Sequence, residues 1–326
     1  MLKLPRRNFL RLAAGATALP AMARLAKAES YPSRPVRLVV GFPPAGTTDI
    51  GARLMAAWLS DRLGQQFIVE NRPGGGSSIA AEYVVRSPAD GYTLLLSTVA
   101  NAINTSFYQN LSFDFARDIA AVGNLFRVPL VMEINPSLPV KTVSEFVAYA
   151  KANPGKITLA SAGTGTSGHI SAELFAMMAG IKMVHVPYRG AGPALVDVIA
   201  GQCQVIFDLL PSSIGYVRGG RTRALAVTTT VRSEALPDIP VLADFVPGYE
   251  ASAWIGIGAP RDTPSEIVDR LNQAINAGLA DPGMKARFAE LGGAAAPGTP
   301  AEFGKFVASE TEKWSRVIKF TNIKAD

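Results

Sequence analysis

Short apolar runs alternate with helical patterns along most of the chain, from residue 36 onward. Runs of this length have the size of strands, and strands that alternate with helices are typical of parallel sheets covered by helices. The chain is therefore expected to be an α/β protein. We predict strands over the following ranges: 36–40, 67–70, 93–97, 131–134, 157–161, 183–186, 205–208, 224–228 and 254–257.

The number of predicted strands is large for a single open sheet with so many helices. We therefore predict two α/β lobes that the chain connects twice, near 125–134 and near 248–257. The first lobe would comprise residues 29–128 plus 252–326, and the second would comprise residues 129–251. The C-terminal helices are then expected to pack back on the first lobe.

Three helix starts are marked by capping boxes, in which a threonine is followed three residues later by a glutamate. They begin at Thr142, Thr263 and Thr299. The last two also have proline at the next position, where the missing N–H is tolerated. We expect each threonine to be the N-cap of a helix.

The basic residues are concentrated at the start of the chain. Residues 1–28 carry six of the 32 lysines and arginines and none of the 26 acidic residues, so the remainder has 26 of each. A neutral remainder offers no electrostatic footprint for nucleic acid, and no such partner is expected. After residue 28 no apolar stretch reaches the length of a membrane span, so a soluble mature chain that does not span a membrane is predicted.

The same segment has the order of parts found in an export signal. PRRNFLR provides twin arginines, LAAGATALPAMA provides an apolar stretch, and residues 26–28 form an A-x-A cleavage pattern. We predict a twin-arginine-type signal peptide, residues 1–28, that is removed near Ala28 and places the protein in the periplasm. The alternative is an amphipathic N-terminal helix.

Several loops rich in glycine, serine and threonine follow predicted strands. In α/β sheets, ligands bind beyond the carboxyl ends of strands, where helix N-termini present free N–H groups. The first loop, GFPPAGTTD, has the glycine spacing of a phosphate loop, but Thr47 stands where that motif requires lysine. One such loop alone is an ordinary turn. The loops together favour a cleft that binds a small carboxylate through backbone and hydroxyl groups.

Side chains suited to catalysis are few. His169 and His185 are the only histidines, and Cys203 is the only cysteine, so no disulfide can form within the chain. No metal-binding or nucleophile motif occurs, and we predict no metal, no cofactor and no catalytic residue. An exported hydrolase or isomerase that uses His169 with a nearby serine is the alternative.

Three charged residues near the loops have two possible roles. Arg189 is the cation best placed for a carboxylate, and it is equally a solvated loop arginine. Asp49 and Asp208 lie beside strand ends, where each could receive a polar group of a ligand. Asp49 could instead stabilise the N-terminus of its helix.

Seven segments, in order, resemble the solute-binding proteins of tripartite tricarboxylate transporters, the Bug family. They are GFPPAGTTDIGARL, ENRPGGGSSIAAE, ADGYTLLLST, ASAGTGTSGHISAELF, HVPYRGAGPALVDVIAGQ, RALAVTTTVRSEALPDIP and WIGIGAPRDTPSEIV. The resemblance covers residues 31–323. It implies a type II periplasmic binding protein fold, in which two α/β lobes are joined by two crossing strands and close on a ligand between them.

The resemblance also implies the function and the partners. Such proteins capture a small carboxylate, which can be a dicarboxylate, a tricarboxylate, an acidic amino acid or an aromatic acid, and deliver it to membrane transporter subunits. A monomer is expected. The alternative is a ligand-loaded partner of a membrane sensor kinase, which the same cleft would serve.

The ligand contacts that the resemblance implies come from both lobes. Ala45 departs from the family pattern, because family members often have a second glycine there. The first lobe would contribute Phe42, Pro43, Ala45, Gly46, Thr47, Thr48, Asp49, Ser97, Thr98 and Asn101. The second would contribute Ser161, Gly163, Thr164, Gly165, Thr166, His169, Tyr188, Arg189 and Asp208.

Overall fold

The computed structural model describes residues 31–44, 46–108, 110–188, 190–290 and 292–321. Its contacts divide the chain into two units, Met1–Ser33 and Arg34–Asp326, and the account below concerns the second. The predicted signal peptide, Ala28 included, lies outside the described residues, as do Ala45 and Arg189. Within the described residues, no helix has both the length and the apolar character needed to cross a membrane.

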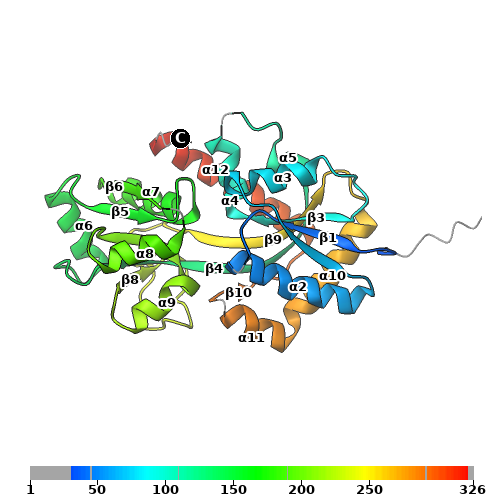
Figure 1. Ribbon diagram of the computed structural model, residues 1–326. Helices are drawn as coiled ribbons and strands as arrows, with labels where there is room; N and C mark the ends of the chain where they lie inside the picture. The colour runs from blue at the N-terminus through cyan, green and yellow to red at the C-terminus, as the bar shows by residue number, and fades with distance from the viewer. Residues whose placement is uncertain (1–30, 45, 109, 189, 291, 322–326) are drawn as a thin grey trace, which may run out of the picture. The chain divides into compact units, whose positions relative to one another are not determined.

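The first part of the sheet consists of parallel strands, each followed by a helix (Figure 1). β1 lies between β2 and β3, with Leu38 opposite both Val69 and Leu94. These strands confirm the first three predicted ranges. Strands and helices here are β1 (Val36–Val40), α2 (Thr47–Leu63), β2 (Phe67–Asn71), η1 (Gly75–Ser77), α3 (Ser78–Val85), β3 (Thr93–Thr98), α4 (Val99–Phe107) and α5 (Phe115–Asp118).

Two long strands, β4 (Ile119–Ile134) and β9 (Ser252–Pro260), join the two parts of the sheet, as Figure 1 shows. They pair antiparallel from Ile119 opposite Pro260 to Pro129 opposite Ser252. The predicted strand 131–134 is only the end of β4. The earlier residues of β4 do not form one apolar run, because the sequence GNLFRVP contains glycine, asparagine, arginine and proline. In this earlier part of β4, the pairing with β9 has two register shifts.

The second part of the sheet repeats the strand–helix pattern. Its parallel strands β7, β5 and β6 lie side by side, while β4 pairs antiparallel with β7 and β8. The order along the main path of the sheet is β2-β1-β3-β9-β4-β7-β5-β6, and β8 lies off this path. The elements are α6 (Val143–Ala152), β5 (Thr158–Ser161), α7 (Ser167–Ala179), β6 (Val184–Pro187), α8 (Ala191–Ile199), β7 (Val205–Leu209), α9 (Leu210–Arg218), β8 (Arg223–Val227) and η2 (Leu242–Asp244).

The chain ends in α10 (Ser265–Ala280), α11 (Pro282–Glu290), β10 (Ala294–Ala295) and α12 (Pro300–Thr321). These elements pack on the first part of the sheet, as predicted, with α10 against α2 and α12 against α4. Helix α12 also reaches α7 of the second part. It therefore contacts both halves.

Two of the three predicted threonine N-caps are confirmed. The Thr142 side chain accepts from the N–H of Glu145, and Thr299 and Glu302 bond each other reciprocally. The third prediction is wrong, because α10 begins at Ser265 with Pro264 as its N-cap. The Thr263 hydroxyl donates instead to the Pro260 carbonyl at 2.7 Å, which closes the turn after β9.

Candidate functional site

A cavity of about 440 Å³ lies between the two halves of the sheet. The N-termini of α2, α4, α7, α8 and α9 all contribute residues to its wall, and they present free N–H groups and the positive ends of helix dipoles. Asp208 is the only aspartate or glutamate of the described lining, which contains no lysine, arginine or histidine. The cavity is thus built to attract an anion without a described basic side chain.

The first loop is shaped by contacts that do not involve the cavity. A Cβ on Gly41 would lie 2.0 Å from the Ser77 hydroxyl oxygen, so this glycine is required for close packing. Asp49 is 1% exposed and accepts from Arg53 Nε at 2.9 Å and from Asn71 Nδ2 at 2.8 Å. Asn71 Nδ2 also donates to the Phe42 carbonyl at 3.0 Å. Asp49 therefore braces the loop, while Phe42, Pro43, Gly46, Thr47 and Thr48 line the cavity.

Of the three predicted residues at the end of β3 and the start of α4, one lines the cavity and two do not. Thr98 lines the cavity and is the N-cap of α4, where its backbone N–H donates to Asn101 Oδ1 at 2.9 Å. Asn101 is buried and does not line the cavity. Ser97 faces a separate cavity of about 130 Å³ beside Phe303 of α12. The side chains of Ser97 and Asn101 thus lie away from the interlobe cavity.

In the second half, the loop before α7 carries Thr164, Gly165 and Thr166 to the cavity wall. The Gly165 N–H donates to His169 Nδ1 at 3.1 Å, and the Thr166 hydroxyl donates to the Gly163 carbonyl at 2.7 Å. Gly165 has a φ of 78°, a conformation that glycine adopts without strain. These bonds hold the backbone of the loop in one shape.

His169 supports this loop from behind. It is 2% exposed, and its ring stacks on that of His185 with centroids 3.7 Å apart. Burial, with a smaller contribution from His185, lowers the pKa of His169 to about 3, so the ring is neutral. Because Nδ1 accepts from Gly165, the ring proton is on Nε2.

The serine nearest to these histidines is also enclosed. Ser161 lies 2.6 Å, Oγ to Nε2, from His185, and it is 0% exposed. Neither Ser161 nor His169 lines the cavity, and Gly163 does not either. The geometry gives the hydrolase alternative no exposed serine–histidine pair.

The remaining predicted residues follow β6 and β7. The Tyr188 hydroxyl donates to Asp197 Oδ2 at 2.6 Å and does not line the cavity, although the neighbouring Gly190 does. Arg189 lies outside the described residues. Asp208 lines the cavity and is 5% exposed, and burial raises the pKa of its carboxyl group.

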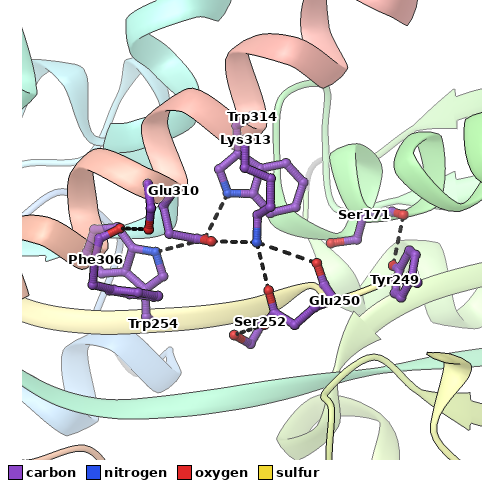
Figure 2. A network of polar contacts seen from close by, with 10 residues as sticks. Ser171, Tyr249, Glu250, Ser252, Trp254, Phe306, Glu310, Lys313 and Trp314 are labelled. Atoms are coloured by element: carbon purple, nitrogen blue, oxygen red, sulfur yellow. Dashed lines mark hydrogen bonds and ion pairs between the residues drawn. The ribbon is translucent and has the colours of Figure 1, made fainter. Parts of the chain in front are cut away.

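The sequence prediction missed the wall that the crossing strands form. Val128 of β4 and Ala253, Trp254 and Ile255 of β9 all line the cavity. Trp254 Nε1 donates to Glu310 Oε2 of α12 at 3.3 Å, which holds the indole in place (Figure 2). The run WIGIG carried no signal that distinguishes a cavity wall from an ordinary buried strand.

Other missed residues flank the predicted loops. Asn104, one turn after Asn101, donates from Nδ2 to the carbonyl of Gly76 at 2.7 Å and so couples two parts of the wall. The other missed members are Pro44, Gly76, Val99, Ala100, Tyr108, Ala162, Ser167, Gly168, Gly190, Ala191, Phe207, Leu209 and Ser212.

No metal site accompanies the cavity in the part of the chain that the structure describes. Among those residues, no three histidine, cysteine, aspartate or glutamate side chains gather closely enough to hold an ion. A site of neutral donors and apolar walls can bind and orient a small acid.

Comparisons of the sequence place the chain among receptors. The model of the family described as "Tripartite tricarboxylate transporter family receptor" matches residues 51–323. The protein BugT of Bordetella pertussis is 35% identical over 300 residues, which cover 91% of this chain and 92% of BugT.

Solved structures give the same answer. The chain resembles Rpa4515 of R. palustris, solved with adipate, at 39% identity and a TM-score of 0.80, covering 89% of this chain and 97% of that one. It also resembles MatC of Rhodopseudomonas palustris, solved with bound malate, at 29% identity and a TM-score of 0.77, covering 88% and 100%. These likenesses confirm the predicted fold class, two α/β lobes joined by crossing strands with a cleft between them.

Proposed function

This chain belongs to the tripartite tricarboxylate transporter receptor family, a family of solute-binding receptors and not of enzymes, and we propose that it binds a small dicarboxylate in the interlobe cavity. The observation that carries the proposal is the convergence of five helix N-termini on a cavity whose described lining has no basic side chain. Relatives of similar fold were solved with adipate and with malate, which are both dicarboxylates.

The magnitudes support a carboxylate held by backbone and hydroxyl groups. A micromolar ligand needs about 8 kcal/mol. Hydrogen bonds to a charged oxygen contribute about 1.5–3 kcal/mol each, and each helix N-terminus adds about 0.3–1 kcal/mol. Four such bonds with two helix ends give about 7–14 kcal/mol, and the upper end of this range covers both the requirement and several kcal/mol of lost ligand freedom.

We assign the ligand contacts to the predicted residues that line the cavity, namely Phe42, Pro43, Gly46, Thr47, Thr48, Thr98, Thr164, Gly165, Thr166 and Asp208. The predicted residues behind the wall position these loops, as the bonds of Asp49 and His169 illustrate. Ala45 and Arg189, which lie outside the described residues, stay predictions.

Calorimetry on the purified protein tests the binding. A series of acids that includes adipate and malate is compared with the diamide of adipic acid, which has the same length and no charge. We expect at least one acid to bind in the micromolar range and the diamide to bind far more weakly. Equal affinity for acid and amide, or no binding by any acid, would contradict the proposal.

We further propose export and delivery. Residues 1–28 would be removed on passage to the periplasm, and the loaded protein would dock as a monomer on membrane transporter subunits. Intact-mass measurement of the protein from the periplasmic fraction should show a chain that begins near residue 29. A pull-down with and without the bound acid would recover transporter subunits if delivery is correct, and a sensor kinase if the alternative holds.

The lobes that close on the ligand would be residues 29–128 with 252–326, and residues 129–251. These boundaries cut β4 after Val128 and the chain before Ser252, at the last pairing between β4 and β9. Small-angle scattering should show a more compact particle when the acid is added. An unchanged profile at saturating ligand would argue against closure about these strands.

A further inference from the structure

Asp208 and Glu133 form a buried pair of carboxyl groups at the cavity. Asp208 is 5% exposed and lines the cavity, whereas Glu133, on β4, is 0% exposed and lies behind it. Ser213 contacts both, because its hydroxyl oxygen bonds Glu133 Oε1 and lies 3.2 Å from Asp208 Oδ2. The two acids are thus connected through a single hydroxyl group.

A count of protons shows what this pair needs. Each hydroxyl group has one proton to donate. The Ser212 hydroxyl oxygen is 2.8 Å from the Leu209 carbonyl, which can only accept, and it also contacts Asp208 Oδ2. When Ser212 donates to the carbonyl and Ser213 donates to Glu133, neither proton reaches Asp208. Asp208 then receives no proton from either serine, and a proton on its own carboxyl group avoids a buried charge that no hydroxyl group compensates.

Glu133 has its own donors. Thr222 donates to Glu133 Oε2 at 2.5 Å, and Ser213 bonds the other oxygen, so both carboxylate oxygens have a hydroxyl partner. Asp208, which borders the cavity, is the member of the pair whose proton can also reach a ligand.

Among the residues that the structure describes, the charged groups on the surrounding elements do not neutralise the pair. On α9, Arg218 donates to the Ala235 carbonyl, and on β8, Arg223 donates to the Val140 carbonyl. On α7, His169 is neutral, and β5 carries no titratable residue. Burial raises the pKa of Asp208 and that of Glu133, the latter to about 7, and it outweighs the hydrogen bonds that favour the charged forms.

We propose that Asp208 holds a proton when the ligand binds and donates it in a hydrogen bond to a carboxylate oxygen of that ligand. The inference rests on the proposed function, because it places a carboxylate in the cavity. An ionised Asp208 would repel the anion that the helix N-termini attract. The protonated side chain instead adds an O–H hydrogen-bond donor to the N–H donors of the helix N-termini. The affinity for the ligand then depends on the protonation of Asp208. At the position beside Asp208, the cavity prefers a ligand carboxylate to a ligand ammonium group.

Calorimetry with adipate as the probe, at pH 6, 7, 8 and 9, tests the coupling. We expect the affinity of the unmodified protein to fall by about tenfold for each pH unit once the pair has lost its proton. Asp208→Asn keeps an N–H donor and cannot ionise, so its affinity should fall much less with pH than that of the unmodified protein; the part that remains is due to Glu133. Asp238→Asn removes an exposed acid of the same half and should behave like the unmodified protein. A pH-independent affinity, or loss of binding in Asp208→Asn alone, would overturn the proposal.

A second measurement needs no ligand and separates this inference from the proposed function. Infrared spectra of the ligand-free protein at pH 7 should contain the carbonyl band of a neutral carboxylic acid, and Asp208→Asn should weaken it more than Glu133→Gln does. If adipate binds neither protein, the proposed dicarboxylate fails, and this band still decides whether Asp208 carries the proton. Its absence, or its full retention in Asp208→Asn, would refute the assignment.

Discussion

Replacement of Glu310 by leucine tests how the C-terminal helix holds the wall of the cavity. Glu310 is 4% exposed, accepts from Nε1 of Trp254 at 3.3 Å and of Trp314 at 3.0 Å, and pairs with Lys313 at 2.5 Å (Figure 2). Lys313 also pairs with Glu250 at 2.8 Å. One carboxylate thus joins α12 to the crossing strand β9.

The expected loss of stability follows from the groups left behind. Two buried indole N–H groups without acceptors cost about 1–3 kcal/mol each. Lys313 adds little, because it keeps Glu250 and is 21% exposed, where water screens the charge. We expect Glu310→Leu to lower the free energy of unfolding by about 3 kcal/mol. Glu310→Gln keeps an acceptor oxygen and should cost about 1 kcal/mol.

Urea unfolding followed by circular dichroism measures both variants. Glu312→Leu, which removes an exposed glutamate of the same helix, is the matched control and should change stability by no more than about 0.5 kcal/mol. Because Trp254 lines the cavity, Glu310→Leu should also weaken the binding of adipate. A cost for Glu310→Leu no larger than that of the control would refute the reasoning.

Three further predictions concern the cavity and its surroundings. Thr47→Pro should abolish the binding of adipate, because it removes a backbone N–H from the cavity wall. It should cost little stability, because proline is tolerated at the first residue of α2. Thr47→Ala, which keeps that N–H, is the control in calorimetry. Gly168→Ala should lower the free energy of unfolding, measured in urea, by about 1–3 kcal/mol, because the added Cβ would lie 2.1 Å from the Phe207 carbonyl oxygen. An unchanged free energy would contradict this, since it would mean that α7 shifts to make room at no cost. Burial raises the pKa of Glu133 from 4.5 to about 7, so the folded protein binds a proton that the unfolded chain has released, and stability should fall by about 3 kcal/mol between these pH values. Glu133→Gln should lack this slope, and parallel pH profiles of the two proteins would contradict the assignment.

The elements of the fold were largely predictable because their signals are local. The residues that form an apolar run, or a capping box, lie within a few positions of one another in the sequence. Eight of the nine predicted strands match observed strands within a few residues. The extent of β4 was not predictable in this way. Its residues 119–129 pair with β9, which lies more than 100 residues later in the chain.

The candidate site shows the same division. The sequence by itself determined which loops meet at the cavity, because the carboxyl ends of parallel strands share one edge of a sheet. It did not determine which side chains of those loops face inward. Asp49 turns to Asn71, Tyr188 to Asp197 and His169 to the ring of His185, and nothing in the sequence indicated these pairings.

Tertiary structure alone decided two features of this protein. It placed Trp254 of a crossing strand in the cavity wall, fastened by Glu310 from the last helix. It also buried Glu133 behind Asp208, although β4 and β7 are far apart in sequence. The physical reason is that strand and helix periodicity are properties of neighbouring residues, whereas the direction and charge of a buried side chain depend on groups that only folding brings together.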